Sequence, residues 1–138
     1  GALPFEFKNF QVKEIDYGAE YINISFDIVM GSDDPITYVG YSYFTFDENG
    51  EGFDSAFTLD EMSRYEMNQM SFPKPMKNGS VYNRGFANVG LDTAQVFVVK
   101  NFYCTKDHPE RMYAPEGEIE YTRFVLPGKD PVMPEVFR

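Results

Sequence analysis

The sequence has no tryptophan, a single cysteine and a single histidine among its 138 residues. With one cysteine, Cys104, no disulfide can form within the chain. A chain of this length can bury roughly two-thirds of the surface that its unfolded form exposes, so one domain can fold without a disulfide or a metal. No apolar stretch approaches the ~20 residues that cross a bilayer as a helix, and we expect no membrane span.

Positive charge is also scarce. Twelve Lys and Arg residues face 22 Asp and Glu residues, which gives a formal net charge of −10, and no run of cations interrupts the imbalance. Affinity for a phosphate backbone comes from clustered cations that release counterions. We therefore expect neither nucleic acid nor an anionic membrane as a partner, whereas a cationic partner or a metal ion stays open.

Aromatic residues, in contrast, are plentiful, with 14 Phe and 10 Tyr. Such side chains suit a pleated, half-buried surface. The clearest strand is Tyr21–Met30, because every second residue is a large apolar one and the intervening positions are mainly polar. Its inward residues are Ile22, Ile24, Phe26, Ile28 and Met30.

The segment Phe5–Ile15 also alternates, but its phase slips by one residue near Asn9. Since such a slip sends every later side chain to the other face, we expect a β-bulge there or a switch from one sheet to the other. Ile36–Phe46 is apolar on both faces around Gly40, which predicts a central strand covered on each side. Three further strands are expected, over Ser80–Val89, Ala94–Cys104 and Glu118–Leu126.

One helix is expected. Thr58 and Glu61 form a capping box, and a loose apolar stripe follows until Pro73. The sequence therefore predicts a short helix over residues 59–70, crossing one end of the sheets.

The order of these elements contains no βαβ alternation, so long-range antiparallel pairing is required. We predict a mainly β, two-sheet Greek-key sandwich of about seven strands with one short helix. A half-open barrel is the structural alternative. Residues 1–126 form the single domain, and residues 127–138, with three prolines, form an extended C-terminal tail.

Four features together resemble a group of bacterial secreted and lipoprotein immunoglobulin-like domains of unknown function, over roughly residues 5–126. They are the alternating strand Tyr21–Met30, the aromatic strand ending in Phe46-Asp47-Glu48-Asn49-Gly50, the turn Lys77-Asn78-Gly79 leading into Arg84–Val89, and the apolar strand Val96–Val99. The resemblance implies an immunoglobulin-like sandwich attached to the cell envelope and without known activity.

The most pointed chemical motif is Cys104, His108 and Met112, which resembles the copper-ligand loop of cupredoxins. Blue-copper sites use one Cys, two His and a weak axial Met. His108 is the only histidine, so the second imidazole is missing. The alternative is that Cys104 is a small hydrophobic residue at a strand end and His108 a loop residue.

The loop Asp47–Asp54 resembles the first half of a calcium loop, with oxygen ligands available at Asp47, Asn49 and Glu51. The twelfth position, which should be a bidentate glutamate, is Thr58. A turn is the simpler interpretation, and a weak calcium site stays open.

Two groups of side chains, one of tyrosines and one of methionines, are candidate binding surfaces. Tyrosines can stack on sugar rings, or pack between the sheets with their hydroxyl groups at the edge; the candidates are Tyr38, Tyr41, Tyr43 and Tyr65. The methionines are expected to be adaptable core filler under the helix rather than a metal or partner groove; they are Met62, Met67, Met70 and Met76.

No residue pattern predicts catalysis: there is no glycine-rich nucleophile elbow, and any triad must use His108. We expect a non-catalytic interaction or structural module of the envelope, with no cofactor, no catalytic residue and no metal site. Its partner is expected to be a protein or glycan at the cell surface. A carbohydrate-binding module and a cupredoxin-like protein with an incomplete site are the alternatives.

The chain begins Gly-Ala-Leu-Pro, without a methionine. We expect that a signal or lipoprotein leader has been removed, and that the protein is extracellular or attached to the envelope. A lipid anchor on the precursor is compatible with this expectation.

Overall fold

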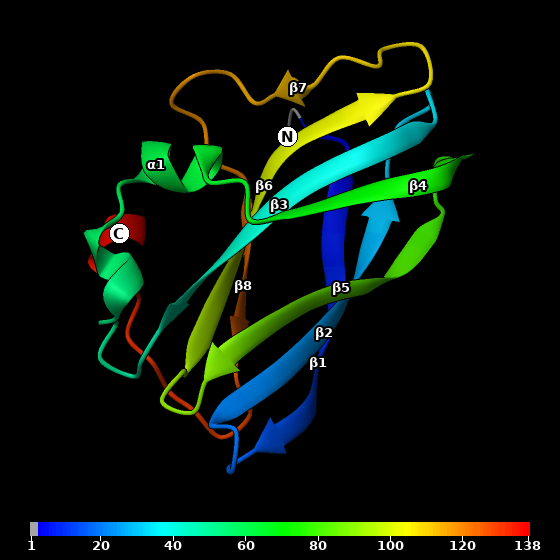
Figure 1. Ribbon diagram of the computed structural model, residues 1–138. Coiled ribbons are helices and arrows are strands. Elements are labelled where there is room, and N and C mark those ends of the chain that lie inside the picture. The colour runs from blue at the N-terminus through cyan, green and yellow to red at the C-terminus, as the bar shows by residue number, and fades with distance from the viewer. Residues whose placement is uncertain (1–2) are drawn as a thin grey trace.

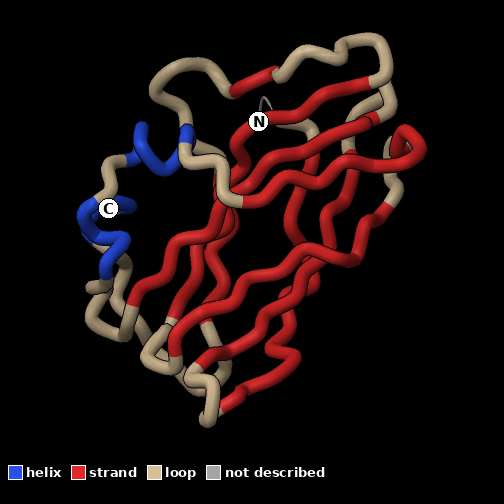
Figure 2. Tube along the Cα trace, viewed as in Figure 1, coloured by secondary structure: helices blue, strands red, loops and turns tan. Residues whose placement is uncertain are grey.

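Eight strands, one α-helix and two turns of 3-10 helix make up residues 3–138, which the computed structural model describes (Figures 1 and 2). The strands are β1 (Phe5–Asp16), β2 (Tyr21–Met30), β3 (Ile36–Phe46), β4 (Asn68–Met76), β5 (Val81–Gly90), β6 (Gln95–Thr105), β7 (Met112–Tyr113) and β8 (Tyr121–Val125). The helical elements are η1 (Phe53–Ala56), α1 (Leu59–Arg64) and η2 (Glu135–Phe137).

The strands form two antiparallel sheets. The smaller sheet has the order β1-β2-β5, and the larger one has the order β4-β3-β6, with β7 and β8 both pairing with the far edge of β6. The chain passes from one sheet to the other after β2, after β4 and after β5, and this order of strands is a Greek key. The predicted mainly β, two-sheet sandwich is confirmed.

The inner core lies between the two sheets and follows from the alternation of the strands. In β2 every second side chain is buried, as the sequence period predicts. Phe7, Phe26 and Tyr41 meet edge to face, with ring centroids 5.4 to 5.7 Å apart. These contacts join β1 and β2 to β3 across the sandwich.

A second apolar cluster covers the outer face of the larger sheet. Phe44 and Phe46 of β3 lie there beside Phe97 of β6, under Met62 of α1. The chain beyond β8 closes this cluster, because Phe137 of η2 stacks on Phe97 at 3.9 Å. The C-terminal turn therefore lies beside η1 and α1 (Figure 1). Strand β3 is central and has apolar cover on both faces, as its sequence predicts.

The predicted extent of the helix is wrong. Helix α1 ends at Arg64, and Asn68–Met76 form β4, an edge strand that pairs with β3. From Asn68 onward the burial alternates with a period of two up to Phe72, which suits a strand. Pairing with the open edge of β3 satisfies the backbone there, whereas a short isolated helix is marginal. Pro73 and Pro75 are tolerated because β4 is an edge strand.

The expected irregularity of β1 lies at Asn9. Its φ of 57° falls in the left-handed region, and the register with β2 shifts between Lys8 and Gln11. Asn adopts this conformation more readily than most residues. Strand β1 pairs with β2 on both sides of the shift, so the predicted bulge is confirmed and the alternative of a sheet switch is wrong.

None of the helices within residues 3–138 has the length and apolar character needed to cross a membrane.

Candidate functional site

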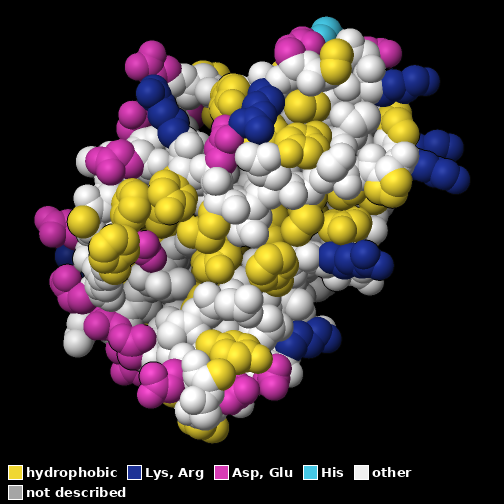
Figure 3. Space-filling view, viewed as in Figure 1, with side chains coloured by type: hydrophobic (Ala, Val, Ile, Leu, Met, Phe, Trp, Pro, Cys, Tyr) yellow, Lys and Arg dark blue, Asp and Glu magenta, His cyan; other side chains and the backbone are white. Residues whose placement is uncertain are grey.

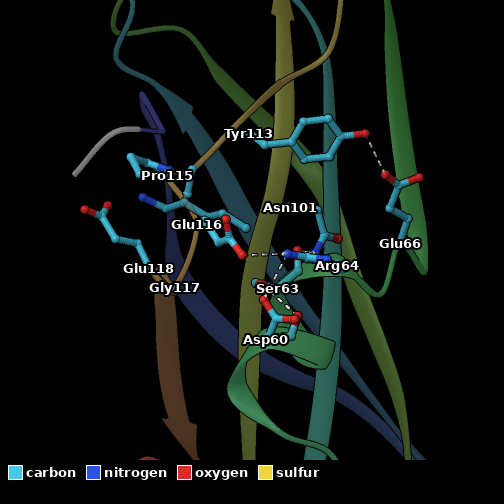
Figure 4. A pocket seen from close by; sticks show the side chains of 12 residues that line it. Asp60, Ser63, Arg64, Glu66, Asn101, Tyr113, Pro115, Glu116, Gly117 and Glu118 are labelled. Atoms are coloured by element: carbon cyan, nitrogen blue, oxygen red, sulfur yellow. Dashed lines mark hydrogen bonds and ion pairs between the residues drawn. The ribbon is translucent and has the colours of Figure 1, made fainter.

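A cleft of about 420 Å³ opens between α1, β6 and the segment that joins β7 to β8 (Figure 4). Its lining is mixed, with charged groups, small polar groups and one aromatic ring. The contributing residues are Asp60, Ser63, Arg64, Glu66, Lys100, Asn101 and residues 113–118. A volume of this size is within the usual range for small-molecule sites.

The cleft exists because the edge of β6 is only partly covered. Strand β7 pairs Tyr113 with Phe102, and β8 begins where Tyr121 pairs with Val99. Between these two pairings the chain leaves the sheet edge over residues 114–120. The Lys100 amide ties the end of this segment back by donating to the carbonyl oxygen of residue 120 at 2.9 Å.

Asn101 forms the floor of the cleft. It is only 2% exposed, and its Nδ2 donates to the Ser63 carbonyl oxygen at 2.9 Å and to Ser42 Oγ at 3.4 Å. Its Oδ1 is buried and accepts no hydrogen bond from the residues that the structure describes. The Ser63 carbonyl can only accept, so it fixes which end of the amide faces it. A buried acceptor without a partner is uncommon in a folded protein and costs stability.

Lys100, next to Asn101, is a buried cation. Its Nζ lies 3.2 Å from Glu6 Oε1 and 3.5 Å from Glu120 Oε1, and it donates to the Leu3 carbonyl oxygen at 3.3 Å. A buried charge requires such partners. The Lys100 ammonium therefore holds the segment before β1 and the start of β1 against the segment before β8, and these contacts occupy it.

Arg64 lies at the mouth of the cleft. Its guanidinium is 3.3 Å from Asp60 and 3.9 Å from Glu116, so it links α1 to the segment between β7 and β8 (Figure 4). All three side chains are largely exposed. Contacts of this kind contribute little to stability, so they can rearrange at little cost.

The ring of Tyr113 forms one wall, and its orientation is fixed. The Tyr113 hydroxyl donates to Glu66 at 3.1 Å, and Arg111 holds Glu66 at 2.5 Å. Arg111 in turn lies over the Phe102 ring, 4.2 Å from its centroid. This network connects the segment before β7 to the segment before β4 and keeps the ring at the cleft.

A second feature, which we call the aromatic surface, consists of Phe53, Phe57, Leu59 and Tyr65 on η1, α1 and their ends. Phe53 is 87% exposed and Tyr65 47% exposed. Phe57 lies 6.2 Å from Phe53 and 5.6 Å from Tyr65, and it contacts the buried Phe44 at 5.5 Å, all between ring centroids. The exposed rings thus continue the packing of the outer cluster.

Carboxylates surround the aromatic surface. Residues 47–66 contain seven Asp and Glu residues and one cation, Arg64. In the space-filling view, hydrophobic side chains gather over the region of η1 and α1 with acidic side chains beside them (Figure 3). This combination of exposed rings and negative charge distinguishes the region from an ordinary polar surface.

The three candidate copper ligands lie in different environments. Cys104 is buried, and this burial raises the pKa of its thiol. His108 is exposed, with Nδ1 at 3.1 Å from Glu110, and Met112 lies in β7 opposite Tyr103. Among residues 3–138 no group of three or more His, Cys, Asp and Glu side chains is arranged to hold a metal.

The acidic loop after β3 uses its carboxylates to hold its own turn. Asp47 Oδ1 accepts from the amides of Asn49 at 2.8 Å and Glu51 at 3.0 Å. Asp54 accepts from the Thr45 amide at 2.6 Å, and burial raises the pKa of Asp54 although these Thr45 contacts lower it. Thr58, at the twelfth position, caps α1. The carboxylates do not converge on one point, which favours the turn interpretation.

The four candidate tyrosines do not share one surface. Tyr41 is buried in the inner core, and Tyr43 reaches from it to the carbonyl oxygen of Asn88. Tyr38 bonds to Gln69 on β4, and only Tyr65 belongs to the aromatic surface. The four rings therefore do not form one platform on which a sugar could stack.

The methionines are distributed as well. Met62 lies under the helix as expected, whereas Met70 and Met76 pack against the inner core from β4, and Met67 is exposed.

Comparisons with protein-family models, with curated proteins and with solved structures found no match for this chain. The function of the chain is therefore inferred from its own residues.

Sequence reasoning missed both Asn101 and Phe53, although each carries a signal. Asn101 follows Lys100 in an otherwise apolar strand, where a polar pair requires partners. Phe53 is a large ring in a loop of glycines and acids, where an apolar residue has no core to enter.

Proposed function

We propose that this chain is a non-catalytic interaction module of the cell envelope and that it binds a protein partner through the aromatic surface. The observation that carries the proposal is the exposure of Phe53 at 87% beside Phe57 and Tyr65. Contiguous exposed rings are typical of protein-binding surfaces. Because Phe57 also packs on buried Phe44, the rings are held in place before a partner arrives, which lowers the entropic cost of binding.

The charge around the rings favours a cationic partner. Seven carboxylates and one arginine in residues 47–66 give this region the same sign as the whole chain. A partner segment with Arg or Lys beside apolar side chains would gain cation–π contacts with the rings and attraction to the acids. We therefore expect a basic, amphipathic segment of a second protein as the occupant.

Binding of model peptides to the purified chain tests this proposal. The probe is a short capped peptide of alternating Arg and Leu, compared with a Glu–Leu and an Arg–Ser peptide of the same length. We expect Phe53→Ser to weaken binding of the Arg–Leu peptide about tenfold, as loss of an exposed aromatic anchor does. Tyr17→Ser is the matched control, because Tyr17 is an exposed ring in the β1–β2 turn.

Equal losses in Phe53→Ser and Tyr17→Ser would contradict the proposal, since charge alone would then explain the binding. Binding of the Arg–Ser peptide as tightly as the Arg–Leu peptide would do the same.

The envelope location rests on the resemblance to secreted and lipoprotein domains. Fractionation of cells that produce the natural full-length protein tests it separately. Recovery with the membrane or outside the cell is expected, and recovery with the cytoplasmic proteins would contradict it.

A further inference from the structure

We propose that the cleft beside α1 binds an amino sugar, that is, a sugar ring carrying hydroxyl groups and a protonated amine. This site is separate from the aromatic surface and does not depend on the proposed protein partner. Its ligand class follows from the acceptors, the charge and the apolar wall of the cleft.

The acceptors of the cleft call for a ligand rich in hydrogen-bond donors. Asn101 lines the cleft, and its buried Oδ1 has no hydrogen-bond partner among residues 3–138; its side chain lies between Tyr113 and Arg64 in the close view (Figure 4). The Nδ2 of the same amide is already used by Ser63 and Ser42. A hydroxyl or ammonium group that reaches Oδ1 would remove the cost of an unsatisfied acceptor. A ligand that can only accept would gain nothing there.

The charge of the lining favours a cation. Four carboxylates and two cations line the cleft, and each cation already contacts two carboxylates. Glu118 is one of these four carboxylates and lies on the segment facing α1, whereas Glu66 is paired with Arg111 from outside the lining. A protonated amine in this space would be attracted by the excess of carboxylates, and an anion would be repelled.

The wall formed by Tyr113, Ala114 and Pro115 accounts for the ring of the ligand. Tyr113 is half exposed, and its hydroxyl is held by Glu66, so the ring face is presented in a fixed orientation. The C–H face of a pyranose packs on such a surface while its hydroxyl groups reach the polar side. An acyclic amine would use the carboxylates and leave this wall uncovered.

Three disaccharides with the same linkage separate these contributions. Chitobiose carries a free amine on each ring, diacetylchitobiose carries acetamides at the same positions, and cellobiose carries hydroxyl groups. Titration of the purified chain by calorimetry and by amide chemical shifts gives the affinity and the location of binding. We expect chitobiose to bind about tenfold more tightly than either neutral analogue, with shifts at Ser63, Asn101 and Tyr113.

Two variants and a control test the residues. Glu118→Gln removes one exposed charge and is expected to lower the affinity for chitobiose about threefold. Asn101→Leu removes the floor acceptor and is expected to lower the affinity for all three sugars. Thermal unfolding checks that this variant folds. Glu20→Gln removes a charge in the β1–β2 turn, at the opposite end of the sandwich, and should leave the affinity unchanged.

Equal affinities for the three disaccharides, or no binding of chitobiose, would overturn the proposal. So would a Glu118→Gln variant that binds as tightly as Glu20→Gln, because charge in the cleft would then have no role. Phe53→Ser should bind chitobiose normally, so failure of the protein-partner proposal and failure of this one are distinguishable.

Discussion

Tyr41 links the two sheets through a single hydroxyl group. On β3, its oxygen accepts from the Phe86 amide of β5 at 3.3 Å and donates to the Phe86 carbonyl oxygen at 3.4 Å. The ring packs edge to face on Phe7 and Phe26. Burial raises the pKa of Tyr41 to about 12, although the hydrogen bond with Phe86 opposes the rise.

Tyr41→Phe should lower the free energy of unfolding by about 1 kcal/mol, because the ring stays and only the hydroxyl contacts are lost. The variant should also be less sensitive to alkali. In the wild-type chain the folded pKa exceeds the unfolded value of 10.0, so stability present below pH 10 is lost as the pH rises to about 12. Urea unfolding of both chains across this range tests the prediction. If both chains lose stability equally as the pH rises, ionisation of Tyr41 is not the cause of the loss in alkali.

A carboxylate whose pKa is lowered by folding stabilises the folded chain as the pH rises. Asp54, whose pKa is raised, should instead destabilise it. Burial raises its pKa above 3.8, so ionisation costs more in the folded chain than in the unfolded one. Asp54→Asn keeps an acceptor for the Thr45 amide and removes the charge. Its stability relative to wild type should therefore increase as the pH rises from 3.8 through the folded pKa of Asp54. Urea unfolding at acidic and neutral pH measures this difference, and a relative loss at neutral pH would contradict it.

At the scale of elements, alternation predicts a strand well when the strand lies inside a sheet. The bounds of β2 agree with the sequence because one of its faces is buried with a period of two, and those of β3 agree because its apolar run, covered on both faces, ends at polar turns. The sequence did not predict β4, because this segment follows the helix that the capping box begins and contains two prolines. Its pairing with β3 is supplied by the fold and not by its own pattern.

The cleft could not be predicted from any one segment. Its lining comes from residues 60–66, from Lys100 and Asn101, and from residues 113–118. Only the pairing of β7 and β8 with the same edge of β6 brings these together. The sequence shows the residue types, whereas the register determines which of them face each other.

Gly40 in β3 leaves room for the Phe102 ring. A Cβ at Gly40 would lie 2.1 Å from that ring, and the ring is buried. Gly40→Ala should therefore destabilise the chain by about 1 to 3 kcal/mol, the usual cost of overpacking. Adding Phe102→Leu should recover part of the loss. Gly18→Ala is the control, because its Cβ would make only an ordinary contact at 3.4 Å. Equal urea midpoints for the two alanine variants would contradict the prediction.

The C-terminal turn should contribute measurably to stability through Phe137. Its ring stacks on Phe97 at 3.9 Å and lies 4.7 Å from Tyr121, both between centroids. Phe137→Ala is expected to cost about 2 kcal/mol, less than a fully buried Phe because the ring is half-buried. Val132→Ala, in the same segment but exposed, should change the stability little. Unfolding of the Phe137 variant at the wild-type urea midpoint would show that the turn does not hold the outer cluster.

At the scale of the whole molecule, the two apolar clusters differ in how they are closed. The inner core lies between two sheets whose strands pair over long sequence separations. The outer cluster is closed by η1, α1 and η2, none longer than six residues. Short elements of this kind open more easily than the strands on which they pack. The aromatic surface lies on this more labile layer, and α1 forms one side of the cleft.

Hydrogen exchange under native conditions tests this difference in closure. The amide of Met62, bonded to Thr58, should exchange through local opening, whereas the amides of Ile24 and Val98 in central strands should require global unfolding. Chitobiose or the Arg–Leu peptide should slow exchange at Met62 in proportion to occupancy, because each binds the closed form. Neither ligand should slow exchange of the Ile24 amide by more than the increase in global stability explains. An amide of Met62 that exchanges as slowly as that of Val98 would mean that the two layers open as one unit, and a ligand effect confined to Met62 would then not be expected.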